Sequence, residues 1–379
     1  MRTTTTTWSP AAGWSTDPSD IPVSADATVA LAFADGRVDT DSALSQLRES
    51  LPGATLVACS TAGQILAAHV DPAPLVVAVV AFDHARVVSA FLPVADQDAQ
   101  AAGEALGALL TERSKGQRIA GVLVFGGGLH INGSALVAGL GQGLPAGTAL
   151  SGGLAGDGTH FEQTWVRCDD ETGEDCVTGF AVIGDHVDFS HGSRGGWDGF
   201  GPTRTITRSD GHILYELDDQ PALLLYKQYL GDRAQELPSS ALLFPLTVSS
   251  PDGTSNLVRT ILAVDETDQS MTFAGDVPEG WSARLMWTTM DRLTQGATEA
   301  AEDSAQPDSG LAVAISCVGR RLVLGERTDE ELESVVEVMG PDTPTVGFYS
   351  YGEIAPVAGL CALHNQTMTV TTIRERTPG

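Results

Sequence analysis

The feature that most constrains this chain is an internal repeat, because the same order of structural parts occurs three times. Each copy has an apolar strand, a helix, a second apolar strand, a short polar break and a third strand. The copies begin with "ATVALAFADG" (27–36), "AGVLVFGGG" (120–128) and "LAVAISCVGRRLVLG" (311–325). Self-similarity of this kind exposes the building unit of a fold. The sequence therefore predicts an α/β protein built from repeated strand-helix-strand units.

The helices and strands of the copies agree with this prediction. Thr40 or Asp41 stands at the start of the first helix, and Thr328 or Asp329 at the start of the third, where each can cap free amide groups. The apolar strand before each polar break is typical of a strand that is buried on both faces. We therefore predict a two-domain protein of repeated strand-helix-strand units with covered mixed β-sheets.

The polar breaks are "TAGQ" (61–64), "LAGD" (154–157) and "YGEI" (351–354). A glycine in each lets the backbone turn sharply, and it leaves Gln64, Asp157 and Glu353 at corresponding places. Ligands collect at strand ends in sheets of this type, so the breaks predict a ligand pocket. The alternative is three tight turns with solvated polar tips.

Composition narrows the class of protein. The formal net charge of -28 comes from 49 acidic against 21 basic residues, which disfavours nucleic acid and anionic membranes as partners. The five cysteines contain no C-x-x-C pair, which favours reduced thiols over disulfides or a zinc site. The longest apolar run, 74–82, is far shorter than the ~20 residues that span a bilayer. We therefore expect a cytoplasmic protein without membrane insertion.

The chain order suggests three segments. Residues 1–20 lack the apolar region of a signal peptide, so we expect them to form a disordered tail. The stretch 191–219 is rich in glycine and then β-prone, which predicts a linking hairpin between two domains. The first domain is expected to cover 21–212 and the second 213–374.

Several motifs together resemble the FIST family of sensory proteins, which are built from a FIST N and a FIST C domain. They are "CSTAGQI" (59–65), "SGGLAGD" (151–157), "GGWDGFGPTRTITRSDGHILYELDDQPALLLYKQYLG" (195–231), "ISCVGRRLVLGER" (315–327), "GFYSYGEIAPV" (347–357) and "LHNQTMTVT" (363–371). The resemblance covers nearly the whole chain after the N-terminal tail. It assigns 21–212 to a FIST N-like domain and 213–374 to a FIST C-like domain.

The resemblance implies a sensory protein that binds an amino acid or a similar small metabolite without a cofactor. Its signal would pass to a separate partner, such as a histidine kinase or a diguanylate cyclase. The alternative that the family suggests is a haem-binding nitric oxide sensor, with His364 as the candidate axial ligand. The family usually carries Glu at the first break, where this chain has Gln64, an amide that hydrogen-bonds but cannot neutralise a cation.

Charged residues near the breaks suggest how a zwitterion would bind. Arg320 follows an apolar strand, where a guanidinium could hold a carboxylate through two parallel bonds. Glu353 or Asp157 would take the ammonium group, and Ser60 and Thr61 would add hydroxyls. The alternative for Arg320 is a structural ion pair.

The remaining candidates flank these motifs. One of Tyr349 and Tyr351 is expected to form a pocket wall with a polar tip, and Trp197 either covers the pocket or packs at the domain junction. Cys59 and Ser60 invite a nucleophile hypothesis, but no G-x-S-x-G elbow occurs and no base can be assigned, so we predict no catalysis. The full set of expected ligand-binding residues is Cys59, Ser60, Thr61, Gln64, Asp157, Trp197, Arg320, Tyr349, Tyr351, Glu353, His364 and Asn365.

Overall fold

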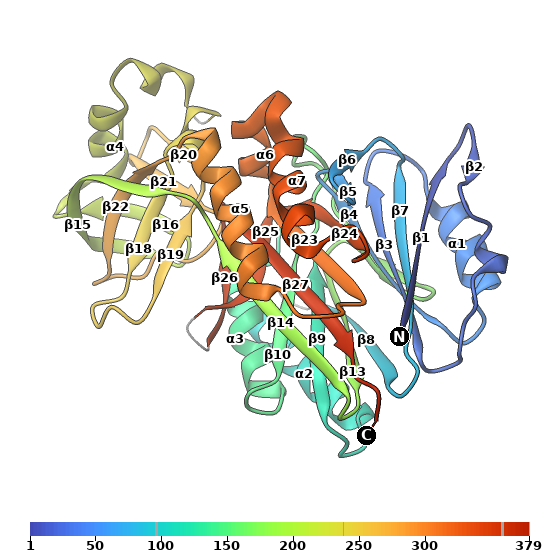
Figure 1. Cartoon of the computed structure of the whole chain (residues 1–379). Coiled ribbons are helices and arrows are strands. Elements are labelled where there is room, and N and C mark those ends of the chain that lie inside the picture. Colours follow the sequence, from blue (N-terminus) through green and yellow to red (C-terminus); the bar gives the residue numbers. More distant parts are fainter. Residues whose placement is uncertain (95–97, 238, 358–359, 379) are drawn as a thin grey trace.

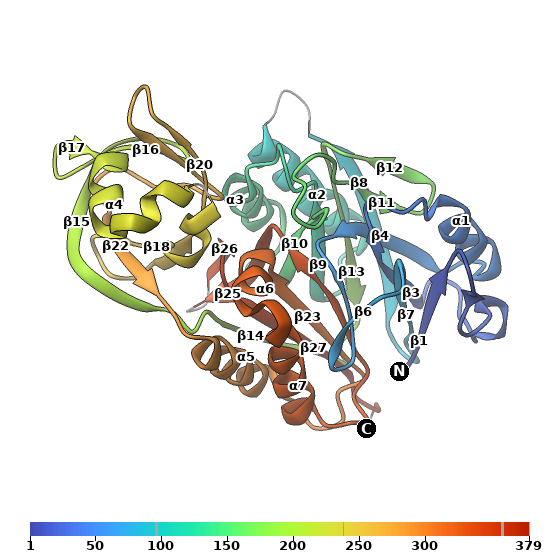
Figure 2. The same cartoon turned by 90° about the horizontal axis from the view of Figure 1, so that it is seen from above.

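The computed structural model describes residues 1–94, 98–237, 239–357 and 360–378. Three α/β units lie side by side, and a separate β domain projects from one of them (Figures 1 and 2). Among the described residues the strands form four sheets, one for each unit and one for the β domain.

The three units share one strand arrangement, which confirms the repeat. In each, the first strand lies between the second, to which it is parallel, and the third, to which it is antiparallel. The elements are β3 (Thr28–Asp35), α1 (Asp41–Ser50), β4 (Thr55–Thr61) and β7 (Leu75–Ala81) in the first unit; β9 (Ile119–Gly126), α3 (Gly133–Gly143), β10 (Ala149–Leu154) and β13 (Cys176–Ile183) in the second; and β23 (Leu311–Cys317), α7 (Thr328–Met339), β24 (Thr345–Ser350) and β27 (Met368–Glu375) in the third.

An additional strand extends each sheet beyond its third strand. These strands are β1 (Arg2–Ser9) beside β7, β8 (Arg86–Pro93) beside β13, and β14 (Val187–Arg194) beside β27. Two further helices, α2 (Ala99–Arg113) and α5 (Met290–Ser304), pack beside α3 and α7. The repeating unit is therefore larger than the sequence pattern indicated.

Each unit donates a hairpin to the sheet of another unit. The hairpin β5 (Gln64–Leu66) and β6 (His69–Asp71) adds to β24, β11 (Val166–Cys168) and β12 (Glu171–Gly173) add to β4, and β25 (Gly352–Val357) and β26 (Leu360–His364) add to β10. The first unit thus extends the third, the second extends the first, and the third extends the second. The exchange closes the units into a ring with approximate threefold symmetry.

The polar breaks meet where the hairpins cross between units. Backbone amides of each break bond to carbonyls in another break or in the strand end just before it: Ala62 to Tyr349, Gly156 to Ser60, and Tyr351 to Leu154. Convergence of the three breaks, which sequence patterns alone could not establish, is therefore a property of the fold.

Apolar strands and their central aromatic contacts hold the ring together. Phe33 of β3, Phe125 of β9 and Phe348 of β24 pack on one another with ring centroids 5.1 to 6.2 Å apart. All three side chains are buried. Aromatic pairs at these distances stabilise a fold by more than the burial of their apolar area. This cluster of three rings therefore joins the three units at their centre.

The β domain is inserted between β14 and α5 of the third unit. Its strands are β15 (Asp198–Asp210), β16 (Ile213–Leu217), β17 (Gln220–Pro221), β18 (Leu246–Ser249), β19 (Asn256–Arg259), β20 (Ile261–Asp265), β21 (Ser270–Phe273) and β22 (Ser282–Trp287). It also carries α4 (Ala222–Leu230), and its apolar core comes from its own residues. In Figure 1 this domain lies at the left, connected to the ring through β15 and α5.

The expected disordered tail at residues 1–20 is wrong. Residues 2–8 pair with β7 along its whole length, and Gly13–Trp14 forms β2 beside β1. The run of threonines suits this edge position because β-branched residues favour strands. The boundary near residue 213 stays a prediction, but β14 precedes it and pairs with β27 beyond it.

Within the described part of the chain, no helix combines the length and the apolar character needed to cross a membrane. All five cysteines are free thiols.

Candidate functional site

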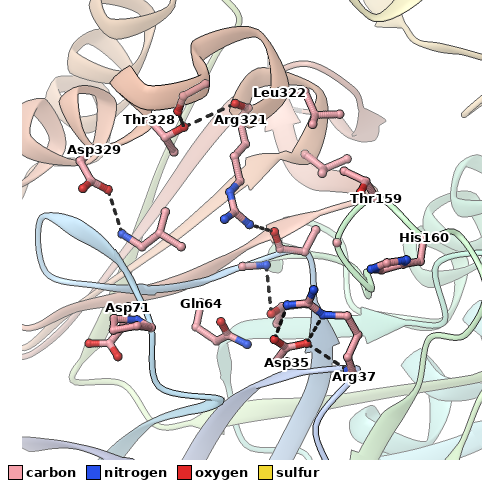
Figure 3. Close-up of a pocket in the computed structure, with 18 of the residues that line it drawn as sticks. Asp35, Arg37, Gln64, Asp71, Thr159, His160, Arg321, Leu322, Thr328 and Asp329 are labelled. Carbon is pink, nitrogen blue, oxygen red and sulfur yellow. Dashed lines mark hydrogen bonds and ion pairs between the residues drawn. The ribbon is translucent and has the colours of Figure 1, made fainter. Parts of the chain in front are cut away.

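A polar cavity of about 710 Å³ opens where the first and third units meet, close to the first polar break (Figure 3). We call it the first cavity. The end of β3, the break at 61–64, the turn at 70–72, the loop at 158–160 and the segment 318–329 all contribute to its wall. All three units therefore line one site.

Asp35 and Arg37 form an ion pair on the side of the cavity built by β3. The Arg37 guanidinium donates two bonds to the Asp35 carboxylate, at 2.9 and 2.7 Å. The hydrogen bond from Arg37, together with the positive charges of Arg37 and Arg321, lowers the pKa of Asp35. This pair is already neutralised internally, so it offers a ligand little net charge.

Gln64 presents an unused amide to the cavity. Its side chain is only 5 % exposed, and its Nε2 has no hydrogen-bond partner in the described structure. Figure 3 shows the amide on the cavity wall between Asp71 and Asp35. A buried amide donor without a partner is costly, so this atom is prepared to donate to a bound molecule.

Arg321 places a cation in the cavity wall beside Gly63, the residue before Gln64. It lies on α6 (Val318–Leu324), donates to the Ala62 carbonyl and sits 5.5 Å from the centroid of the Tyr349 ring. A Cβ at Gly63 would overlap its guanidinium, and Gly63 has a φ of 137°, a backbone conformation that favours glycine. In the described chain Arg321 has no acidic partner within ion-pair distance.

The neighbouring Arg320 has a different role from the expected one. It is fully buried and binds Glu331 through Nε and Nη2, at 3.0 and 2.8 Å. Its other donors bond to the carbonyls of Gly195 and Leu293. Arg320 therefore forms the structural ion pair that was the alternative, and four of its five N–H groups already bond to the protein.

The Glu331 carboxylate also holds residues that lie behind the cavity wall. Glu331 accepts bonds from Tyr349 Oη at 2.7 Å and Ser316 Oγ at 3.0 Å. Burial, followed by the adjacent Glu331 charge, raises the pKa of Tyr349 far above its usual value, so the phenol stays protonated and donates. The buried Tyr349 ring is thus held in place by Glu331 and forms the face over which the Arg321 guanidinium lies.

Acidic side chains line the outer part of the first cavity. Asp71 caps the turn at Ala73, and Asp329 accepts a bond from the Val70 amide at 3.0 Å. Glu326 is exposed and has no partner among the described residues. The cavity therefore joins a cation and an amide donor at one end to carboxylates at the rim.

Glu353 is buried away from the first cavity. Its carboxyl group binds Ser350 Oγ at 2.6 Å and Thr367 through both the amide and the hydroxyl. Burial raises its pKa to about 8, against the opposing effect of these hydrogen bonds. Arg320 and Glu353 thus fail to form the expected binding pair for a zwitterion.

Asp157 organises the loop that follows the second break. Its carboxylate accepts bonds from the amides of Phe161, Glu162 and Gln163 at 2.8 to 2.9 Å, and from the Tyr351 hydroxyl. Burial opposes ionisation, but these bonds outweigh it and lower the pKa of Asp157. Asp157 therefore holds the loop that lines the cavity.

The other expected residues are divided between core and junction. Cys59 and Ser60 are fully buried; burial raises the Cys59 pKa, and Ser60 Oγ accepts from the Trp165 amide. Neither has the setting of a nucleophile. Trp197 donates to the Gln366 carbonyl, and neither amide atom of the buried Asn365 has a partner in the described chain.

Of the expected residues, Thr61 and Gln64 line the first cavity, and Tyr351 lines a second, described below. Sequence reasoning missed Asp35, Arg37, Asp71, His160, Arg321, Glu326 and Asp329. The two adjacent arginines in "CVGRR" gave a partial signal for Arg321. Adjacent residues on a helix point about 100° apart, so the two side chains must lie in different environments, although the sequence does not show which one lines the cavity.

A haem bound through His364 does not fit these residues. His364 is buried outside both cavity walls, its Nε2 lies 3.2 Å from the Ala355 carbonyl, and burial lowers its pKa to about 4. In the described residues no group of three or more His, Cys, Asp or Glu side chains is arranged to hold a metal ion.

The fold and the cavity define an α/β ligand-binding protein. The chain belongs to the FIST family, since the FIST N domain matches residues 28–220 and the FIST C domain matches residues 222–356. FIST domains are sensory domains that bind small ligands and are not a catalytic family.

Similar proteins give little further information. An uncharacterized protein of Mycobacterium tuberculosis is 27% identical over 238 residues, covering 59% of this chain and 60% of that protein. An uncharacterized protein of Methanocaldococcus jannaschii is 22% identical over 232 residues, covering 54% of this chain and 44% of that protein. The matches therefore span less than two thirds of these relatives.

A solved chorismatase structure aligns over 98% of both chains, with 9% identity and a TM-score of 0.37. This similarity is too weak to support an argument.

Proposed function

We propose that this FIST protein senses a small zwitterion, such as an amino acid or a similar metabolite, in the first cavity. The observation that carries the proposal is that one cavity wall holds both Arg321, which has no acidic partner within ion-pair distance in the described chain, and the unused buried amide of Gln64. A volume of about 710 Å³ lies within the usual range for small-molecule sites.

The arrangement suggests an orientation for the ligand. The carboxylate would bind the Arg321 guanidinium and accept from Gln64 Nε2, since both donors flank Gly63. The ammonium group would face Asp71, Glu326 and Asp329 at the rim. A neutral amide at position 64 is suited to this role because it adds a donor without repelling the carboxylate.

Ligand binding would change the contacts of α6. Arg321 now donates to the Ala62 carbonyl, and a ligand carboxylate would compete for the same guanidinium. Since α6 lies between β23 and α7, a shift of Arg321 is a direct route from the cavity to the outer helices. We propose that a separate partner, a histidine kinase or a diguanylate cyclase, reads this change in the cytoplasm.

The test is a thermal-shift screen of amino acids, followed by calorimetry on the native chain and on Arg321→Gln. Each charged hydrogen bond contributes about 1.5–3 kcal/mol, so Arg321→Gln should weaken binding roughly ten- to a hundredfold. Arg327→Gln is the matched control, because Arg327 pairs with Asp291 and Glu330 outside the cavity wall.

Two results would refute the zwitterion proposal: a screen that finds only neutral ligands, or an Arg321→Gln variant with native affinity. The methyl ester and the decarboxylated amine of the best ligand separate the two charged contacts. Loss of affinity in both analogues is expected if the carboxylate and the ammonium group are each recognised.

The haem alternative has its own test. Haemin is added to the native chain and to His364→Ala, and the Soret band is recorded. We expect no band that depends on His364, because its ring is buried away from both cavities. A band that disappears in the variant would contradict this expectation.

A further inference from the structure

We infer a second ligand site in a cavity between the second unit, the third unit and the inserted β domain. Its ligand is an uncharged compound with a flat aromatic ring and a hydrogen-bonding group. The cavity has a volume of about 390 Å³, which suits a small molecule. We call it the second cavity.

Among the described residues that line the second cavity there is no Asp, Glu, Lys or Arg, and the ionisable side chains are two histidines, His130 and His212. Its apolar surface includes Leu129, Ile131, Leu242 and Leu262, and its polar groups include Asn132 and Thr260. An ionised ligand would lose its hydration here without gaining a counter-charge, which is costly. The lining therefore selects for neutral compounds, in contrast to the first cavity.

A stacked aromatic pair forms one side of the second cavity. The rings of Phe161 and Tyr351 lie 4.6 Å apart at an interplanar angle of 19°. Phe161 is 43 % exposed although it is large and apolar, and it has a φ of 55°, which a bulky residue rarely adopts. Strained backbone of this kind persists only where surrounding contacts hold it.

The holding contacts come from Asp157, which fixes the Phe161 amide at 2.9 Å and the Tyr351 hydroxyl at the same time. One carboxylate thus positions both rings of the pair. The result is an exposed, preorganised aromatic face, to which a flat ring can add by stacking.

Thr260 supplies a polar contact inside the second cavity. It lines the cavity between the end of β19 and the start of β20, is 4 % exposed, and its Oγ1 has no hydrogen-bond partner in the described chain. A buried hydroxyl without a partner is destabilising on its own. A donor or acceptor on the ligand would satisfy it, and this requirement sets the second feature of the ligand class.

The experiment uses indole as the probe, because it is neutral and flat and carries one N–H donor. Saturable binding to the full chain is measured by calorimetry and by ligand-observed NMR. Phe161→Ala should weaken indole binding about three- to tenfold, since it removes the stacking face. Trp287→Ala is the matched control, because Trp287 is equally exposed, at 43 %, but does not line the cavity.

Thr260→Val separates a binding role from a structural one. Valine has nearly the same shape but no hydroxyl, so the variant should melt at or above the native temperature while binding indole about five- to tenfold more weakly. Arg321→Gln should leave indole affinity unchanged, and indole-3-carboxylate should bind more weakly than indole.

Absence of saturable indole binding up to its solubility limit would overturn the inference. Native affinity in both Phe161→Ala and Thr260→Val would do the same, as would tighter binding of the carboxylate analogue.

Discussion

At the scale of single residues, two adjacent arginines show what sequence reasoning could and could not find. The sequence indicated correctly that a guanidinium follows the strand at 311–317, but it pointed to Arg320 instead of Arg321 as the one near a ligand. The difference arises because α6 begins at Val318, so successive side chains diverge and Arg320 turns into the core. No local pattern marks which of two identical residues is buried.

This difference predicts opposite phenotypes for the two arginines. Arg320→Met should lower the free energy of unfolding by about 3–5 kcal/mol, because it leaves the buried Glu331 carboxylate without its partner. Arg321→Gln should change it by less than about 1 kcal/mol, since its side chain is partly exposed and lacks an ion pair in the described structure. Urea unfolding measures both values, and equal effects would contradict the assignment.

The buried Glu353 predicts a pH dependence of stability. With a folded pKa of about 8 and an unfolded value near 4.5, the folded state holds a proton that the unfolded state releases, so stability falls as pH rises between these values. Burial lowers the pKa of His191 and of His364 to about 4. Below pH 6.5 the unfolded state therefore binds protons that the folded state does not, so stability falls as the pH drops. Stability should therefore be highest near pH 6.5.

The measurement is urea unfolding of the native chain and of Glu353→Gln at pH 6.5 and pH 8. The native chain should lose about 1–2 kcal/mol over this range, because a proton difference of one changes stability by ~1.4 kcal/mol per pH unit. Glutamine keeps the size of the side chain but does not titrate, so its variant should show a much smaller loss. A parallel decline in both proteins would show that another group is responsible.

At the scale of elements, the sequence predicted the three strand-helix-strand units but not the exchange of their hairpins. Local periodicity identifies a strand, whereas the partner of that strand depends on contacts far along the chain, as between β5 and β24. The backbones of the three polar breaks do meet in the fold, yet the side chains at their corresponding positions lie in different places. Only Gln64 of the three corresponding residues lines the first cavity, while Asp157 and Glu353 satisfy buried backbone and hydroxyl groups.

Asp157 gives an element-scale prediction for the loop at 158–163, which lies between the two cavities. Asp157→Asn should speed amide hydrogen exchange at Phe161, Glu162 and Gln163 about tenfold or more, because the carboxamide has one acceptor oxygen in place of two. Exchange in β9 should stay unchanged, which provides the internal control. Unchanged protection at all three amides would show that other contacts hold the loop.

At the scale of the whole molecule, the ring and the inserted domain differ in how far they depend on distant parts of the chain. The ring cannot be cut near residue 213 without separating partners, since β14 pairs with β27, and β25 pairs with β10. The β domain, in contrast, has one sheet and a core drawn from its own residues. The expected boundary therefore separates segments that share sheets.

Fragment expression tests this difference. Residues 198–287 alone should give a folded, monomeric protein with a cooperative thermal transition and dispersed NMR signals, because the core of this domain is self-contained. Residues 1–212 alone should aggregate or unfold, since β10 and β14 lose their partners and leave exposed sheet edges. A fragment 1–194 joined by a short glycine-serine linker to 288–379 restores both pairings and should fold, which makes it the matched control. A stable, monomeric 1–212 fragment would instead support two domains that divide near residue 213.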